Sequence, residues 1–481
     1  MNRRMILNAV GVALKAESLL LLLPTIVSII YREHCCFAFI ITAAVSFLLG
    51  TAFTVFIKPR THIIYAKDGF IIVAATWIML SAVGSLPFVI SGAIPSVVDA
   101  FFETVSGFTT TGASILTEVE SLSHGILFWR SFTHWIGGMG IIVFVTAILP
   151  NVSERPIHIL RAEMPGPVLG KLVPRIRDTA VILYLIYIAM TILEMILLFA
   201  GGMPIFDSIV LSFGTAGTGG FGIKNDSIAG YTPYMQWVIA VFMILFGINF
   251  NLYYLIIAKR VKEALKSSEL WFYIGIVAAS ALIIAVDIYS ICDSLSVSLR
   301  TSVFQVASII STTGYATTDF NLWPSLSKNV LLMLMFIGGC AGSTAGGIKV
   351  SRILMMFKLV GNEIRHMIHP RSVTSLKLEG KKIDRATAKS VSNYFLIYII
   401  CFFIVFLLIS FEPFDFETTF TTAATCFNNV GPGFGGVGPT SNFSAYSDFS
   451  KIILSIAMLM GRLEIFPFII AFAPSTWSKN R

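Results

Sequence analysis

The sequence predicts an all-α polytopic membrane protein built from four tandem helix–pore loop–helix repeats. Of its 481 residues, 56% are hydrophobic and 12% are charged, whereas a soluble domain carries about 25% charged residues. Apolar runs of about 20 residues, the length of a membrane-spanning helix, recur along the whole chain. A short polar stretch ending in glycine recurs four times between such runs, and this regular period indicates an internal repeat.

Two apolar runs, predicted as helices at about 5–30 and 36–57, precede the first repeat and make up residues 1–67. The first run is longer than the core of a signal peptide and lacks an Ala-x-Ala-like exit. We therefore expect it to be retained as a transmembrane helix.

The four repeats occupy residues 68–178, 179–268, 269–387 and 388–481. Each repeat combines a span, a short re-entrant piece and a returning span. The paired spans are expected at 70–93 and 126–149, 179–202 and 234–258, 271–292 and 329–358, and 389–411 and 450–473. With the two N-terminal helices, the sequence predicts ten spans and four half-spans.

The basic residues predict the orientation of the chain. If the N-terminus is inside, the inner segments hold 26 of the 34 Lys and Arg residues, which is the positive-inside pattern. Both termini are then cytoplasmic, and all four re-entrant pieces lie toward the outer side. A solvated inner face beside anionic headgroups accounts for most of these charges, so the net charge of +8 does not indicate nucleic-acid binding.

The four re-entrant pieces are the candidate ion site. Irregular backbone at membrane depth is tolerated only when it is buried in protein or lines a wet cavity. A ring of backbone carbonyls can replace the hydration shell of a cation, and the negative ends of the preceding helices favour a cation on the axis. The candidate loop residues are Thr110, Thr111 and Gly112; Gly217, Thr218 and Gly219; Thr312, Thr313 and Gly314; and Asn429, Val430 and Gly431.

Four such loops, each between two spans, resemble the Trk/Ktr/HKT superfamily of cation uptake proteins. The two extra N-terminal helices resemble its TrkH-type bacterial members. The resemblance implies a pseudo-fourfold pore in a single chain, with potassium uptake through a filter formed by the candidate loop carbonyls. In this family glycine at all four filter positions goes with potassium selectivity, and serine in the first goes with sodium transport. Gly112, Gly219, Gly314 and Gly431 therefore favour potassium.

Two alternatives stay open for these loops. A sodium-permeable or Na⁺/H⁺-coupled symporter of the same fold would share the repeat, and the loops lack the longer Thr-Val-Gly-Tyr-Gly run of a stricter filter. Small and hydroxyl residues can also serve only to pack helices, as in small-xxx-small contacts. Four loops in register make that second interpretation the weaker one.

The third returning span contains an unusual glycine-rich segment at 338–347. Glycine at this density should break the helix, because each costs about 1 kcal/mol against alanine. We expect a flexible gating loop below the filter, and the TrkH-type resemblance implies the same role. A GxxxG packing face is the alternative. The candidate gating residues are Gly338, Gly339, Gly342, Ser343, Thr344, Gly346 and Gly347.

Arg462 lies near the middle of the last predicted span. A central intramembrane Arg costs at least about 2.5–3.5 kcal/mol by insertion scales, so it should face the interior. The family resemblance implies that it points into the pore, where it would act as a barrier to cations. A structural ion pair with another helix is the alternative.

Other function classes have little support in the sequence. Gly217 to Gly222 matches a dinucleotide-binding pattern but follows a pore helix, without a βαβ unit. The six cysteines include no CxxC pair, and the seven histidines no HExxH. We therefore expect no enzyme and no bound cofactor, with K⁺ as the transported ion. The resemblance also implies a multi-pass protein of the bacterial inner membrane, a homodimer, and a cytosolic nucleotide-binding regulatory subunit of the TrkA type.

Overall fold

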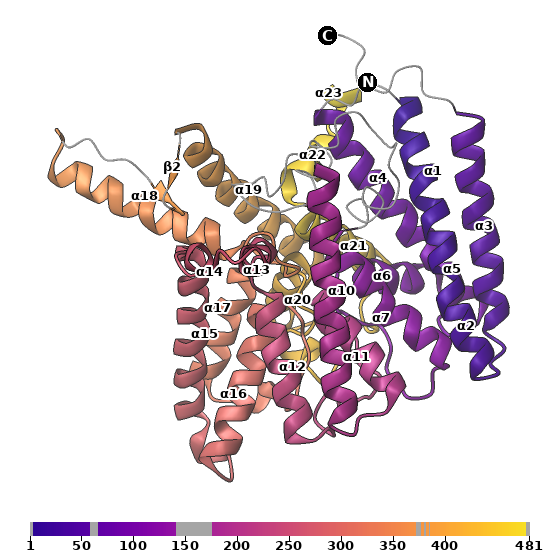
Figure 1. Cartoon of the computed structure of the whole chain (residues 1–481), viewed down its shortest axis with the longest axis horizontal. Coiled ribbons are helices and arrows are strands. Elements are labelled where there is room, and N and C mark those ends of the chain that lie inside the picture. The colour runs from indigo at the N-terminus through magenta and orange to yellow at the C-terminus, as the bar shows by residue number, and fades with distance from the viewer. Residues whose placement is uncertain are drawn as a thin grey trace.

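The computed structural model describes residues 3–57, 66–140, 176–371, 377–379, 381–383 and 385–477. The predicted all-α fold is confirmed: these residues form a helical bundle, to which only the two-residue strands β1 (Lys377–Leu378) and β2 (Lys381–Lys382) are added (Figure 1). Residues 141–149 of the predicted 126–149 span, and residues 151–175 of the inner segment that follows it, lie outside the described residues.

The N-terminal helices form a separate layer at one edge of the bundle (Figure 1). They are α1 (Arg3–Leu20), α2 (Leu22–Ile30) and α3 (Cys36–Val55). Helices α1 and α3 pack along their length, and the Ser46 hydroxyl donates to the Leu14 carbonyl at 2.9 Å. Their outward faces stay apolar and exposed, as expected for helices surrounded by lipid.

Each repeat begins with a long apolar helix. These four helices are α4 (Ala66–Gly84), which continues into α5 (Leu86–Ile90), α10 (Ile176–Ala200), α15 (Ser268–Asp287) and α19 (Arg385–Ile409). All four are apolar enough to span a membrane. Apart from the buried Glu194 of α10, their charged residues lie near the helix ends.

A short, buried pore helix follows in each repeat. The pore helices are α6 (Val97–Phe108), α11 (Ile205–Gly217), α16 (Leu295–Ile310) and α20 (Phe416–Asn428). They have 12 to 16 residues, fewer than the roughly 20 that a span needs. Three of them begin at a polar N-cap, where the side chains of Ser96, Ser294 and Asp415 accept a backbone N–H. These caps fix the entry of each helix into the apolar core.

The returning helices are interrupted. They are α7 (His124–Gly138), α12 (Pro233–Phe246) with α13 (Phe250–Ile257), α17 (Ser325–Ile337) with α18 (Val350–Ile368), and α21 (Asp448–Arg462) with α22 (Ile465–Phe472). The bend is 93° between α12 and α13 and 120° between α21 and α22. The sequence predicted a break in the third returning span, and the structure shows that 234–258 and 450–473 are bent as well.

Within the described residues, six helices are long and apolar enough to cross a membrane, or eight if each bent pair is one span. This is fewer than the ten predicted spans, because α7 and α17 each end near a glycine after 15 and 13 residues. Helix α18 extends away from the bundle (Figure 1). The remaining short elements are α14 (Val261–Ala264), α23 (Pro474–Trp477), η1 (Tyr289–Ile291), η2 (Phe320–Leu322) and η3 (Gly435–Val437).

Candidate functional site

The four pore helices end in the same backbone geometry. A residue in the left-handed region terminates each helix: Thr110 (φ 54°), Thr218 (φ 56°), Thr312 (φ 57°) and Asn429 (φ 56°). In each loop the next residue donates its N–H to a carbonyl in the last turn of the pore helix, at 2.8–3.0 Å. A β-branched residue with positive φ is an outlier. Three threonines and one asparagine with positive φ at equivalent positions indicate one loop structure used four times.

A glycine with positive φ stands two residues after each of these turns. The glycines are Gly112 (φ 80°), Gly220 (φ 73°), Gly314 (φ 88°) and Gly431 (φ 100°). A Cβ at each would meet a carbonyl oxygen of the next loop, in cyclic order: Gly219 for Gly112, Thr313 for Gly220, Val430 for Gly314 and Thr111 for Gly431. The four loops therefore surround one axis with pseudo-fourfold symmetry, and the loop from the last repeat contacts the first.

This geometry corrects the register of the second loop. Gly217 and Gly219 were predicted as its first and last filter residues, but Gly217 is the last residue of α11. Gly220, which the prediction omitted, takes the place of Gly112, Gly314 and Gly431. The second triad is thus Thr218, Gly219 and Gly220. The sequence contains both Gly219 and Gly220. Because the loop motif requires only one glycine, the sequence alone does not decide which of the two fills that position.

A cavity of about 160 Å³ opens above the four glycines. Gly112, Gly220, Gly314 and Gly431 all line it, whereas Gly219 does not. Polar side chains and exposed backbone from the segments that follow each loop form its walls. The cavity is therefore an entrance that leads directly to the ring of loops.

Side chains behind the loops hold them in place. The Thr111 hydroxyl is 2.8 Å from that of Thr109 and accepts a hydrogen bond from Asn429 Nδ2 at 2.9 Å. Asn429 also donates to the Met458 carbonyl at 2.9 Å. In the third repeat the Thr313 hydroxyl pairs with that of Ser311 at 2.7 Å. Apart from Asn429 Oδ1, which has no hydrogen-bond partner among the described residues, these side-chain groups satisfy one another and leave the loop carbonyls available for an ion.

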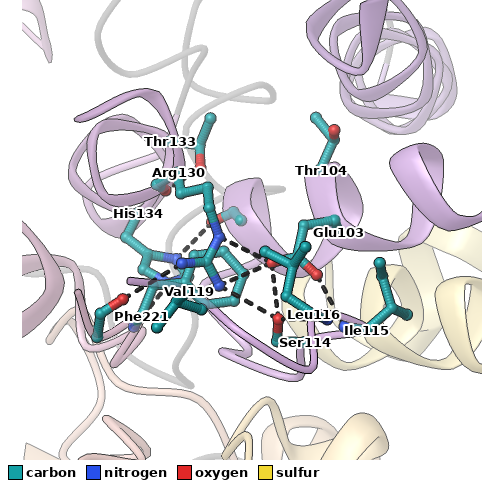
Figure 2. A network of polar contacts seen from close by, with 12 residues as sticks. Glu103, Thr104, Ser114, Ile115, Leu116, Val119, Arg130, Thr133, His134 and Phe221 are labelled. Atoms are coloured by element: carbon teal, nitrogen blue, oxygen red, sulfur yellow. Dashed lines mark hydrogen bonds and ion pairs between the residues drawn. The ribbon is translucent and has the colours of Figure 1, made fainter. Parts of the chain in front are cut away.

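A buried ion pair ties the first loop to the second. Arg130 of α7 and Glu103 of α6 lie 2.8 Å apart, and both are almost fully buried (Figure 2). Glu103 also accepts hydrogen bonds from Ser114 Oγ and the Ile115 N–H. The Arg130 guanidinium lies 4.1 Å from the centre of the Phe221 ring. Glu103 lies inside α6 and holds the segment that follows the first pore loop.

His134 makes a second link between the same two repeats. Its Nδ1 donates to the Gly107 carbonyl at 2.7 Å, and its Nε2 accepts from the Phe221 N–H at 3.3 Å. The ring lies against Gly219, where a Cβ would overlap it. Sequence analysis did not single out Arg130 or His134, because each is an ordinary polar residue until the fold brings the two repeats together.

The glycine-rich loop lies directly beneath the ring. Gly338 ends α17 with φ 72°, and the Gly346 N–H donates to the Thr312 hydroxyl at 2.6 Å. The Gly347 N–H donates to the Asn428 carbonyl at 3.1 Å. The loop that was predicted as a gate therefore contacts the third and fourth pore loops.

The same loop is joined to the bend between α12 and α13. The Gly342 carbonyl accepts from the Phe250 N–H at 3.0 Å, and the Thr344 hydroxyl donates to the Phe246 carbonyl at 3.2 Å. Ser343 bonds within the loop, to the Cys340 carbonyl. Gly339 accepts from the Val350 N–H, so the loop closes onto the start of α18. The segment cannot continue as a straight helix, because the carbonyls of Gly339 and Gly342 accept hydrogen bonds from α18 and α13 instead of from the next helical turn.

Arg462 reaches across the inner side of the ring. Its guanidinium donates to the carbonyls of Thr344, Gly137 and Gly138, each at 2.7 Å. It thereby joins the fourth repeat to the first repeat and to the glycine-rich loop. Arg462 also lines a cavity of about 40 Å³, together with Gly346 and Gly461. That volume holds only about three waters, so the inner side of the ring is narrow.

Lys349 brings further positive charge to this cavity, and Glu464, the partner of Arg352, lines it as well. The Lys349 ammonium donates to the Ala345 carbonyl, and Arg352 forms an ion pair with Glu464. The Arg352 guanidinium lies 4.0 Å from the centre of the Tyr394 ring. The glycine-rich loop is thus held from below by side chains of the third and fourth repeats.

Comparison with known proteins identifies the family. The model of the family TrkH, described as cation transport protein, matches residues 36–480. The chain is 37% identical to the Trk system potassium uptake protein TrkH of Salmonella typhimurium over 484 residues, covering 99% of this chain and 100% of that protein. It is 36% identical to the protein of that name from Escherichia coli K12, with the same coverage. The crystal structure of the potassium transporter TrkH from Vibrio parahaemolyticus superposes with a TM-score of 0.89 at 33% identity, covering 99% of this chain and 100% of that one.

Proposed function

Because this chain belongs to the TrkH family of cation transport proteins, we propose that it takes up potassium ions across the bacterial plasma membrane through a channel-like pore. The relatives that match along their whole length are named potassium uptake proteins. The observation that carries the proposal is the cyclic packing of four positive-φ glycines against the carbonyls of the next loop. This packing supports a ring of backbone oxygens around a single ion path.

The selectivity of the pore follows from this ring. An ion that leaves water needs oxygens to replace its hydration shell, and the carbonyls after the pore helices can supply them. The negative ends of α6, α11, α16 and α20 point toward the same axis and lower the energy of a cation there. Thr110, Thr218, Thr312 and Asn429 begin the four stretches that carry these carbonyls.

The glycine-rich loop and Arg462 are the gate in this proposal. A positive guanidinium below the ring repels an entering cation, and the loop narrows the remaining space to about 40 Å³. Because Arg462 also binds the Thr344 carbonyl, movement of the loop and movement of Arg462 are coupled. Opening requires both to leave the axis.

Two further features belong to the proposal. The chain works as a homodimer, and its inner face binds a cytosolic nucleotide-binding regulatory subunit of the TrkA type. The name "Trk system" given to the relatives supports a multi-subunit assembly. The basic last turn of α18, with Arg365 and His366, supplies positive charge on that face. Light scattering should give a protein mass near twice 52.7 kDa for the purified chain.

Isotope flux into proteoliposomes tests the transport proposal. We expect potassium to enter faster than sodium, without an imposed sodium or proton gradient. If potassium entry depended on either gradient, the result would instead support a coupled symporter. If sodium entered as fast as potassium, the result would support a non-selective transporter. Complementation of a potassium-uptake-deficient bacterium gives the same test in cells.

Substitution of Arg462 tests the barrier. Arg462→Gln should raise potassium flux, because it removes the positive charge below the ring. Arg462→Lys keeps the positive charge but loses the planar guanidinium that contacts three carbonyls. It therefore separates the electrostatic repulsion of the entering cation from the hydrogen bonds that hold the loop. Arg260→Gln is the matched control, since Arg260 is exposed and pairs only locally with Glu263. Flux unchanged in Arg462→Gln would contradict the barrier.

A further inference from the structure

An apolar groove of about 400 Å³ runs between α1, α4 and α22. Its size is within the range of about 300–1,000 Å³ usual for small-molecule pockets. Apart from Arg3 at one end, every residue that lines it is apolar. The hollow exists because small side chains face it from two helices: Ala74 and Ala75 on α4, and Ala471 on α22.

The α4 wall of the groove is one continuous helical stripe. Ile71, Ala74, Ala75 and Ile78 follow the spacing of one helix face. Lys67 stands four residues before Ile71, so it continues this stripe by one turn beyond the apolar lining, and it is exposed. The groove therefore has an apolar floor and a cationic end.

Positive charge is present on both walls at that end. Arg3 lines the groove from the first turn of α1, and the neighbouring Arg4 is exposed. Asp68 is the nearby acid, and its side chain is buried within the bundle. Among the described residues at this end of the groove, the cations therefore outnumber the acid. An apolar channel with cations at its mouth matches a molecule that has a long hydrocarbon tail and an anionic head.

We propose that this groove binds one anionic phospholipid, with an acyl chain along Ala74, Ala75 and Ala471 and its phosphate beside Arg3 and Lys67. The N-terminal ends of α1 and α4 lie at the mouth, so in the proposed orientation the lipid comes from the cytoplasmic leaflet. The position of the groove gives the lipid a structural role. Helix α22 belongs to the fourth repeat and packs on α4 of the first. This contact is the seam of the ring, where the last repeat meets the first without a chain connection between them. The lipid fills a gap beside that seam.

Native mass spectrometry of the full-length chain in neutral detergent tests the site without depending on transport or orientation. The delipidated protein is titrated with phosphatidylglycerol or with phosphatidylcholine of the same acyl chains. We expect one phosphatidylglycerol to bind at least tenfold more tightly than phosphatidylcholine. Each cation near a membrane surface contributes about fivefold in anionic-lipid affinity. The double variant Arg3→Gln/Lys67→Gln should therefore lose about 25-fold for phosphatidylglycerol only.

Filling the groove tests the apolar half of the site. Ala75→Trp should abolish the tight binding, and the smaller Ala75→Leu should weaken it if the tryptophan variant is unstable. Matched controls are Lys262→Gln/Lys266→Gln, which removes two exposed cations far from the groove, and Ala279→Trp on an exposed face of α15. Both controls should bind lipid as the unmodified chain does.

Three outcomes would overturn the proposal. The first is equal affinity of the unmodified chain for the two lipids. The second is unchanged phosphatidylglycerol binding in Ala75→Trp or in the double variant. The third outcome combines two results: the unmodified chain binds no lipid, and Ala75→Trp changes the thermal stability of the protein. Together they would mean that protein, not lipid, occupies the groove.

Discussion

At the scale of single residues, the proposed ion path depends on backbone conformations that most side chains avoid. Thr110, Thr218 and Thr312 hold a β-branched side chain at positive φ, which costs on the order of 1–3 kcal/mol at each position. The surrounding packing must supply that energy, since all three residues are fully buried. The strain turns the chain sharply after each pore helix, so that the following carbonyls can form one ring.

The register of the second loop gives a first prediction. Gly220→Ser should lower the potassium-to-sodium flux ratio about tenfold, as Gly112→Ser should, because a Cβ at either position meets a carbonyl of the next loop. Flux of both isotopes in proteoliposomes measures the ratio. If Gly220→Ser keeps full selectivity, the structural equivalence of Gly220 and Gly112 does not extend to function.

The link between filter and gate gives a second prediction. Thr312→Val keeps the side-chain shape but removes the hydroxyl that accepts the Gly346 N–H. Loss of one hydrogen bond of about 1 kcal/mol should shift the loop toward its open position and raise potassium flux about fivefold. Thr110→Val is the matched control: it has the same backbone geometry, and among the described residues its hydroxyl has no hydrogen-bond partner. Equal effects of the two substitutions would contradict a specific contact.

At the scale of elements, glycine breaks in the returning helices recur in every repeat. Helix α7 ends at Gly138, α12 ends before Gly247, α17 ends before Gly338, and α21 ends after Gly461. Two of the later segments start at a non-glycine residue with positive φ, Lys349 and Glu464. The breaks make room for the glycine-rich loop and Arg462 beneath the ring, so the inner half of the molecule is not a simple helical bundle.

Helix α7 is also fixed at its outer end by a residue from the N-terminal layer. Glu33 accepts the N–H groups of His124 and Gly125, at 2.7 and 3.0 Å, and the His124 ring at 2.9 Å. Burial acts to raise the pKa of Glu33, but these hydrogen bonds outweigh it and hold the pKa below its ordinary value. The ionised carboxylate therefore stabilises the start of α7.

A pH-dependent loss of stability follows as a third prediction. Because the folded pKa of Glu33 is lowered, its contribution is fully present above the ordinary carboxyl pKa and is lost as pH falls through the folded pKa. Thermal unfolding should show the unmodified chain more stable than Glu33→Gln at neutral pH, with the difference vanishing in acid. Glu118→Gln, at an exposed position, should show no such difference. If the difference in thermal stability between the unmodified chain and Glu33→Gln persisted in acid, this mechanism would be excluded.

At the scale of the whole molecule, four repeats in one chain must hold a ring that separate subunits form in symmetric assemblies. Side chains join the repeats: Arg130 and His134 connect the first to the second, and Arg462 connects the fourth to the first. The buried pair of Arg130 and Glu103 lies beside the segments that follow the first two pore loops (Figure 2). Its loss should therefore affect stability and selectivity together.

The buried pair gives a fourth prediction. Arg130→Met leaves the Glu103 carboxylate buried without its partner, which typically costs about 3–5 kcal/mol. The double variant Arg130→Met/Glu103→Gln removes the orphaned charge and should recover part of that stability. Thermal unfolding in detergent, with potassium-to-sodium flux measured in parallel, tests both effects. A double variant that is less stable than Arg130→Met would contradict this account.

The sequence by itself determined the membrane class, the four repeats and the pore loops, because apolar length and a recurring polar break are local properties of the chain. It also located the glycine-rich segment at 338–347, which the structure places beneath the ring. Only the tertiary structure decided the second loop's register, since Gly219 and Gly220 are locally equivalent and only packing against Thr313 distinguishes them. The bends in the second and fourth repeats and the Arg130–Glu103 pair were equally hidden. Each depends on contacts between residues far apart in the chain, and a local pattern carries no information about them.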